Sequence, residues 1–229
     1  EQQLIATQSI TSFFASTLLE DPRAKKWAQN FNPLFSQPAV VQKVTPLQLE
    51  FYVSPTHLDS VDFEDFSQPT GRNSWGHANQ AAVCKVEHRL LGTKSSKSGF
   101  MTGAEISWPA SGAGRTENPF YQMNAAAEGS GWNVSSFEAL EFRVSQIRRE
   151  VIPQTGVSFS VAVLDSENRM SNTVTVSDFQ SIKGPVHSST LFYGFRIPLA
   201  QLKGANLEQL RAVRFIFDQT PMGKLLFSN

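Results

Sequence analysis

Three tryptophans and one tyrosine lie beside loop-forming residues and are the first candidates for ligand contacts. Trp75, Trp108 and Trp132 each stand near glycine, proline or asparagine, and Tyr121 follows Phe120. Flat aromatic faces stack on sugar rings, and polar ring edges supply hydrogen bonds. Large aromatic side chains also dominate small β-sandwich cores. We therefore predict a carbohydrate site at Trp75, Trp108, Tyr121 and Trp132, with core packing as the alternative for each ring.

Residues for nucleophilic catalysis do not occur in the required spacing. Ser130 and Ser111 each lie next to glycine, but neither has the Gly-x-Ser-x-Gly order of a nucleophile elbow. A glycosidase needs two carboxylates about 5–10 Å apart in a cleft. The carboxylates that stay open for such a pair are Glu105, Glu128, Glu138 and Asp165. We expect no catalytic residues in this chain, with a free-standing glycoside-active enzyme as the alternative.

A transition-metal site is not indicated by the histidines and the single cysteine. His77, Cys84 and His88 match no strong zinc pattern. Cys84, Val86, His88 and Leu90 alternate along one predicted strand and so share a face. Half-buried packing of this face is the favoured interpretation.

Composition argues against nucleic-acid binding, an internal disulfide and a membrane span. The 229 residues carry 20 basic and 20 acidic side chains, a formal net charge of zero, so the surplus of positive charge typical of nucleic-acid binding is missing. One cysteine allows no internal disulfide. No apolar run reaches the roughly 18 residues of a membrane span. The 40% content of hydrophobic residues is ample for a folded core.

Most of the chain shows the two-residue period of β-strands. Apolar and polar residues alternate in each of four segments, and turn-forming residues separate them. The alternating segments are 140–145, 157–163, 191–197 and 213–217. A further strand is expected at 224–229, and short helical turns at 198–202 and 206–210. Many short strands with one apolar face predict an all-β fold, a two-sheet antiparallel β-sandwich of the jelly-roll kind.

The beginning of the chain has a different pattern. Residues 1–31 repeat apolar side chains at three- and four-residue steps and predict helices. Residues 32–58 contain several prolines and read as a connector, with a possible strand at 47–53. The predicted organisation is therefore a helical segment at 1–31, a linker at 32–58 and the β-sandwich at 59–229.

Several strand blocks resemble those of a known class of domains. Residues 137–144, 159–165, 195–199, 202–207 and 213–218 carry the resemblance. They resemble the C-terminal, galactose-binding-like domain behind some secreted α/β-hydrolases, which itself resembles carbohydrate-binding modules. Residues 1–31 resemble the last helices of such a hydrolase body. The resemblance implies a secreted or extracytoplasmic protein whose own catalytic domain lies upstream of this chain.

The resemblance also implies a structural calcium ion. Jelly-roll sugar-binding domains often hold Ca²⁺ between the first and last strands, with carboxylate and carbonyl oxygens as ligands. Asp62 and Glu64 would share one face of the first strand, and Asn229 lies at the end of the last. Solvated charges at the edge of the sheet are the alternative for the two acidic residues. The function implied is a non-catalytic accessory domain that binds a glycan or polymer, or packs on the catalytic body. A purely structural interaction domain is a further alternative.

Overall fold

The computed structural model describes most of the second of two compact units, Glu1–Leu58 and Asp59–Asn229. The described residues are Phe14, Leu18, Leu19, Val61, 63–91, 101–110, 117–146, 156–182 and 192–228. The predicted linker and almost all of the predicted helical segment lie outside them. Phe14, Leu18 and Leu19 are exposed. Within the part of the chain that the structure describes, no helix has the length and apolar character of a membrane span.

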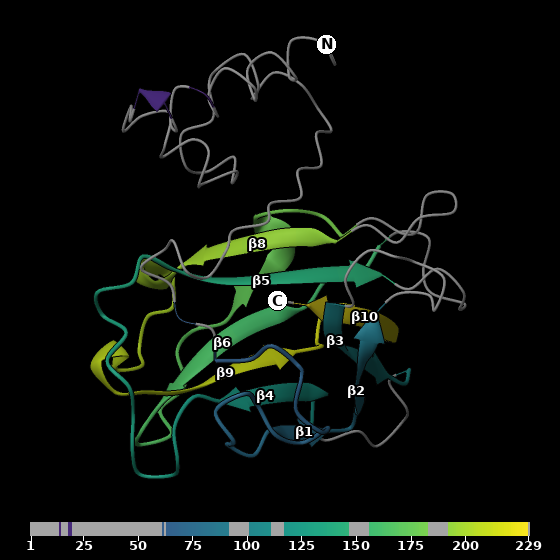
Figure 1. Cartoon of the computed structure of the whole chain (residues 1–229). Coiled ribbons are helices and arrows are strands. Elements are labelled where there is room, and N and C mark those ends of the chain that lie inside the picture. The colour runs from purple at the N-terminus through teal and green to yellow at the C-terminus, as the bar shows by residue number, and fades with distance from the viewer. Residues whose placement is uncertain are drawn as a thin grey trace. The chain divides into compact units, whose positions relative to one another are not determined.

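The described residues of the second unit form two five-stranded antiparallel sheets (Figure 1). Sheet I has the order β1 (Gln80–Ala82), β4 (Phe120–Asn124), β9 (Leu210–Ile216), β6 (Ser160–Asp165) and β7 (Val174–Thr175). Sheet II has the order β2 (Lys85–Leu91), β3 (Met101–Trp108), β10 (Gly223–Ser228), β5 (Ala139–Gln146) and β8 (Tyr193–Pro198). Three short 3₁₀ helices complete the described elements: η2 (Val176–Asp178), η3 (Leu199–Gln201) and η4 (Leu207–Gln209).

The chain crosses repeatedly between the two sheets, which confirms the predicted jelly-roll sandwich. The strands β8, β9 and β10 belong in turn to sheet II, sheet I and sheet II. Each of β3, β9 and β10 therefore pairs with strands far away in sequence, as when β10 pairs with both β3 and β5. Such long-range pairing places loops from distant parts of the chain together at each end of the sandwich.

Phenylalanines from both sheets fill the space between them. Phe215 on β9 lies 5.1 Å from Phe142 on β5 and 4.9 Å from Phe227 on β10, measured between ring centroids. Phe159, just before β6, contacts Phe215 and Phe227 and has no exposed surface. Burial of one such ring stabilises a fold by about 1.5–3 kcal/mol. This aromatic seam links the two sheets at the centre of the core.

The predicted strands agree with the structure where alternation was strong. The segments 140–145, 191–197, 213–217 and 224–229 correspond to β5, β8, β9 and β10, and the helical turns at 198–202 and 206–210 correspond to η3 and η4. The prediction of one continuous strand at 157–163 was wrong at its start: Val157 forms only an isolated bridge with Ile182, and β6 begins at Ser160.

The expected position of the first strand was also wrong. Phe63, Glu64 and Asp65 lie in irregular chain, and β1 begins only at Gln80. The cause is local hydrogen bonding by the acidic side chains, because Glu64 accepts from the backbone N–H of Phe66 and Asp65 from that of Ser67. Side chains that bond the neighbouring backbone compete with strand pairing.

Candidate functional site

Trp75 lies in a tight loop before β1 that a buried asparagine holds in one conformation. Asn73 has no exposed surface, and its Oδ1 accepts hydrogen bonds from the backbone N–H groups of Trp75 and His77 at 3.2 and 2.9 Å. Its Nδ2 donates to the carbonyl of Asn124 at the end of β4. Gly76 has a φ of +80°, which a glycine adopts without strain. The loop therefore presents Trp75, 38% exposed, from a fixed base.

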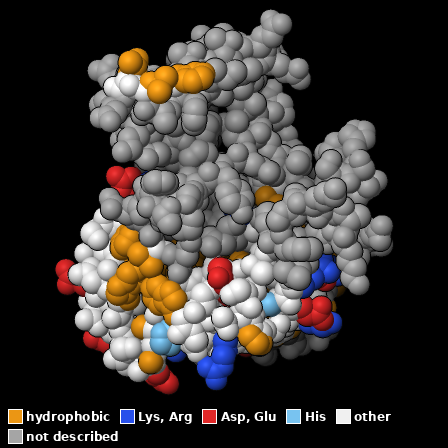
Figure 2. Space-filling model, viewed as in Figure 1, with side chains coloured by type: hydrophobic (Ala, Val, Ile, Leu, Met, Phe, Trp, Pro, Cys, Tyr) orange, Lys and Arg blue, Asp and Glu red, His pale blue; other side chains and the backbone are white. Residues whose placement is uncertain are grey.

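Trp75 and Trp132 meet edge to face and form the centre of an aromatic surface. Their ring centroids are 5.1 Å apart with an interplanar angle of 77°. Phe63 packs on Trp75, with centroids 6.3 Å apart, and Phe137 packs on Trp132 at 5.7 Å. We call Phe63, Trp75, Trp132 and Phe137 the aromatic rim. Figure 2 shows hydrophobic side chains gathered on one face of the described sandwich.

The segment that carries Trp132 is docked on the beginning of β9. Trp132 and Leu210 exchange two backbone hydrogen bonds, at 2.8 and 2.9 Å, and the N–H of Val134 donates to the carbonyl of Leu207. At Gly131 an added Cβ would lie 2.3 Å from the carbonyl oxygen of Gln209, so only glycine permits this approach. The backbone thus sets the position of Trp132 independently of its side chain.

The other two predicted aromatic residues point into the core. Trp108 is 3% exposed, stacks on Phe217 with centroids 4.3 Å apart, and donates its indole N–H to the carbonyl of Thr220. Tyr121 is 1% exposed. Neither ring presents a face to a ligand in this structure. The structure brings Trp75 and Trp132 together, and it places Trp108 and Tyr121 in the interior.

Next to the loop of Trp75, a chain of buried and half-buried polar groups joins Glu64 to His88. Asn79 donates to Oε2 of Glu64 at 3.0 Å and to the hydroxyl of Tyr121 at 2.9 Å. That hydroxyl lies 3.1 Å from Nε2 of His88, whose Nδ1 lies 2.9 Å from the carbonyl of Gln68. The chain of bonds ties the irregular segment before β1 to β2 and β4.

The calcium prediction rests on residues that are only partly described. Asp62 and Asn229 lie outside the described residues. Glu64 is 7% exposed, and its two oxygens accept from the N–H of Phe66 and from Asn79. Those bonds use part of the capacity that a calcium ion would need. Among the described residues, no three acidic, histidine or cysteine side chains form a group suited to a metal.

Cys84 and His88 pack as the strand pattern predicts. Both are half-buried, as is Val86, and the Cys84 thiol donates to the carbonyl of Phe120. Burial raises the pKa of the Cys84 thiol to about 11, so the thiol keeps its proton at neutral pH. A protonated, half-buried thiol is a poor nucleophile and a poor metal ligand.

His88 and Glu64 have pKa shifts that arise from the same burial but act in opposite senses on stability. Burial lowers the pKa of His88, although its contact with Gln68 and the charge of Asp65 act the other way. Burial raises the pKa of Glu64, although the hydrogen bond from Asn79 acts the other way. The neutral forms of both side chains are therefore favoured in the folded protein.

The first prediction concerns this pair. Folded His88 binds its proton less tightly than an unfolded histidine, so its contribution is present above about pH 6.5 and is lost as the pH falls. Glu64 has the opposite sign: its contribution is present below about pH 4.5 and is lost as the pH rises. The quantity to compare is the slope of the unfolding free energy against pH between about pH 5 and 7. His88→Gln should make this slope smaller, because His88 adds stability as the pH rises. Glu64→Gln should make it larger, because Glu64 loses stability as the pH rises. Urea unfolding at each pH measures both, and a His88→Gln slope equal to the wild-type slope would contradict the prediction.

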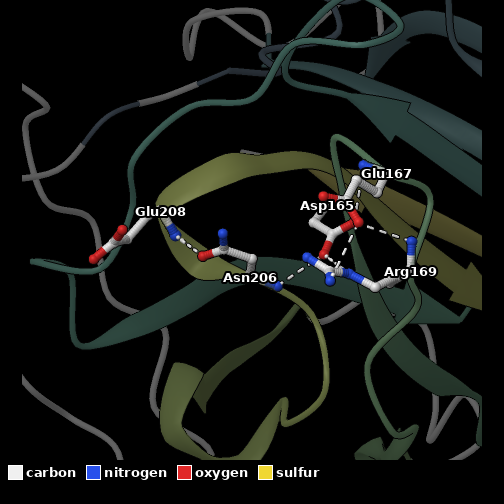
Figure 3. A network of polar contacts seen from close by, with 5 residues as sticks. All are labelled: Asp165, Glu167, Arg169, Asn206 and Glu208. Carbon is white, nitrogen blue, oxygen red and sulfur yellow. Dashed lines mark hydrogen bonds and ion pairs between the residues drawn. The ribbon is translucent and has the colours of Figure 1, made fainter.

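A second polar network fixes the turn after β6 (Figure 3). Oδ1 of Asp165 accepts from the N–H groups of Glu167 and Arg169, and Oδ2 accepts from Nε of Arg169 and the N–H of Asn206. Burial alone would raise the pKa of Asp165, but these bonds together lower it to about 2. Asn206 in turn caps η4 by accepting from the N–H of Glu208 at 3.0 Å. Because Leu207 of η4 accepts a hydrogen bond from Val134, this network also helps to fix the segment that carries Trp132.

A polar site on the outer face of sheet I was missed by the sequence reasoning. Arg214 on β9 donates from Nε and Nη2 to Oε1 of Gln122 on β4, at 2.9 and 2.6 Å. The sequence pattern does indicate the position of Arg214, because it lies between Val213 and Phe215, which both face the core. Strict alternation places the side chain between them on the opposite face.

Comparison with known proteins gives likenesses of fold. No protein-family model matches the chain, and no curated protein matches it. Among solved structures, a family 30 carbohydrate-binding module has 12% identity and a TM-score of 0.47, over 72% of this chain and 94% of that chain. The family 11 module of the cellulosomal cellulase Lic26A-Cel5E of Clostridium thermocellum has 12% identity and a TM-score of 0.42, over 72% and 89%. An exo-beta-agarase has 8% identity and a TM-score of 0.44, over 73% and 24%.

Proposed function

We propose that the sandwich binds a glycan at the aromatic rim, with Trp75 as the main contact and Trp132 beside it. The observation that carries the proposal is an indole 38% exposed on a loop whose base, Asn73, is fully buried and hydrogen-bonded on both sides. Exposed aromatic rings in fixed positions bind ligands well because little conformational freedom is lost on binding. An indole also offers a flat apolar face and a polar N–H to a sugar ring.

A non-catalytic role agrees with the state of the carboxylates that were candidates for a glycosidase. Glu105 pairs with Arg89 and Lys224, at 2.5 and 2.6 Å, on sheet II. Glu138 pairs with Arg196, and Asp165 accepts four hydrogen bonds while fully buried. A general acid or nucleophile must reach the substrate, which the burial of Asp165 prevents. Glu138 and Glu128 are exposed, so the support for a non-catalytic role comes from Asp165 and from the doubly paired Glu105.

The accessory role behind a secreted α/β-hydrolase is the wider form of the proposal. It is supported by the strand blocks named in the sequence analysis and by the helical pattern of residues 1–31. In this form, the aromatic rim would hold an upstream catalytic domain near its polymer. The proposal is tested on the chain itself, because glycan binding at Trp75 needs no second domain.

The second prediction tests the rim directly. Trp75→Ala should lower the affinity for a bound oligosaccharide by about tenfold or more, which corresponds to about 1.4 kcal/mol. Trp75 is the better target, because Trp132 also packs against the core. Isothermal titration calorimetry of the full chain with cello-, xylo- and galacto-oligosaccharides measures the effect.

Met222→Ala is the matched control. Met222 is 40% exposed, and it lies in the turn after β9, whereas Trp132 pairs at the start of that strand. The control should leave affinity unchanged. Equal affinity of wild type and Trp75→Ala for every oligosaccharide that binds would reject the rim as the site.

A further inference from the structure

The outer face of sheet I carries a cationic side chain in a fixed orientation. In the strand register, Arg214 on β9 lies between Gln122 on β4 and Ala162 on β6. Its Nε and Nη2 atoms both donate to Oε1 of Gln122, and its guanidinium carbon lies 4.3 Å from the centroid of the Phe120 ring. Ala162 on this face has no exposed surface, whereas Arg214 is only half-buried and keeps part of its surface exposed. The guanidinium is therefore held in one plane by a hydrogen bond pair and a ring.

Gln122, the hydrogen-bond partner of Arg214, is itself held in place by a neighbouring asparagine. Gln122 is 1% exposed, and its Nε2 donates to Oδ1 of Asn124 at 2.7 Å. Asn124 in turn donates to the carbonyl of Ala78, next to β1. These two buried amides thus fix the orientation of Gln122, so that its oxygen and not its nitrogen faces Arg214. Preorganised groups of this kind are typical of binding sites, because their orientation is set before a ligand arrives.

The charge of Arg214 is not balanced by an ion pair within the described residues. It is half-buried, and its hydrogen-bond partner Gln122 is neutral. Arg211, 7% exposed, likewise donates to a neutral group, Oδ1 of Asn168, and its buried Nε has no hydrogen-bond partner. Burial lowers the pKa of Arg214, the charge of Glu117 opposes this, and the charge of Arg211 adds to it.

Such an arrangement is more stable when an anion is present. Removing a cation from water without a paired anion is unfavourable, and two neighbouring cations repel each other. Asp218, the other carboxylate near this face, accepts from the hydroxyl of Ser160 at 3.1 Å. A planar guanidinium with free N–H groups matches the geometry of carboxylate and sulfate oxygens.

We propose that Arg214 binds an oxyanion group carried by the glycan, either the carboxylate of a uronic acid or a sulfate ester. This inference rests on the proposed function, because the glycan supplies the anion. Trp132 pairs with Leu210, four residues before Arg214 on β9, which is about 13 Å along the strand. An oligosaccharide of a few rings covers that distance.

The experiment compares three tetrasaccharides on the full chain by isothermal titration calorimetry: a galacturonic acid tetramer, a sulfated galactose tetramer and an unsubstituted galactose tetramer. The wild type should bind one acidic tetramer about tenfold more tightly than the neutral one. Arg214→Gln should abolish that preference, and added salt should weaken acidic binding to the wild type only. Which acidic tetramer binds identifies the source of the anion.

Lys203→Gln is the matched control for net charge. Lys203 is exposed in the loop after η3, so its loss should leave the preference for the acidic tetramer intact. If Arg214→Gln does not fold, as judged by thermal melting, Arg214→Lys keeps the charge, loses the planar pair of donors, and should lose part of the preference.

The outcomes separate this inference from the proposed function. Equal binding of acidic and neutral tetramers by the wild type, or an acidic preference that survives in Arg214→Gln, overturns the inference while loss of binding in Trp75→Ala still supports the rim. Unchanged binding in Trp75→Ala with a lost preference in Arg214→Gln rejects the rim and supports an anion site. If the wild type binds none of the three tetramers, the anion site is overturned. If it also binds none of the cello-, xylo- and galacto-oligosaccharides, the rim is rejected as well.

Discussion

Asp165→Ala is expected to lower the free energy of unfolding by about 3–5 kcal/mol, because the change removes a fully buried carboxylate and leaves its hydrogen-bond donors without their acceptor. Asp165 has no exposed surface, and its two oxygens accept from three backbone N–H groups and from Arg169. Alanine removes the charge and both acceptor oxygens, and with them all four hydrogen bonds. The backbone donors of Glu167 and Asn206 lie in a tight turn and a cap, where they have few alternatives (Figure 3).

Urea unfolding at neutral pH measures the loss, and Glu167→Ala is the matched control. Glu167 also pairs with Arg169, at 3.2 Å, but its side chain is exposed, and exposed pairs contribute about 0–1 kcal/mol. The pKa of Asp165 near 2, against 3.8 for a free aspartate, adds a pH test. A lowered pKa gives stability that is present above pH 3.8 and is lost as the pH falls toward 2, and Asp165→Ala should lack this acid-dependent loss. Equal stability of the two alanine variants would contradict the prediction.

The same variant connects stability to the binding surface. Asn206 joins Asp165 to η4, and Leu207 of η4 accepts a hydrogen bond from Val134, two residues after Trp132. Loss of Asp165 should therefore loosen the backbone that positions Trp132. The acidic residue acts at a distance from any sugar, through the backbone that it fixes.

Strands with clear alternation were predictable because one face of each must meet the opposite sheet. The segments around Phe142, Phe195 and Phe215 show this period, and each became a strand with its phenylalanine in the core region. The short strands β1 and β7 carry too few residues for a period to appear. β1 pairs with β4, which is far away in sequence, and β7 pairs with β6, to which a hydrogen-bonded turn joins it.

The aromatic candidates show where residue type stops being informative. Trp108 alternates with Ala104 and Ile106, both with no exposed surface, so its strand position marks it as a core residue. Trp75 has no such period, because hydrogen bonds of the Asn73 side chain set its loop. Its closeness to Trp132 follows from the docking of two loops at one end of the sandwich. That contact depends on the order of strands in sheet I, which no local pattern contains.

Phe215→Ala is the second change with a large expected effect, again about 3–5 kcal/mol of unfolding free energy. The ring has no exposed surface and contacts Phe142 and Phe227 from sheet II as well as Phe159. Alanine at this position leaves a cavity at the centre of the contact between the sheets. The cost combines lost burial with lost packing around the cavity.

Phe179→Ala and Phe215→Leu make the comparison specific. Phe179 follows η2 and is only partly buried against the core, so its loss should cost less, about 1–2 kcal/mol. Leucine at 215 refills part of the volume and should recover part of the stability. Denaturant unfolding with an unchanged m-value would show that stability, and not the unfolded state, has changed. If Phe215→Ala cost no more than Phe179→Ala, the aromatic seam would not be an important contact between the sheets. The loops that carry Trp75 and Trp132 would then have to be held in place by other contacts.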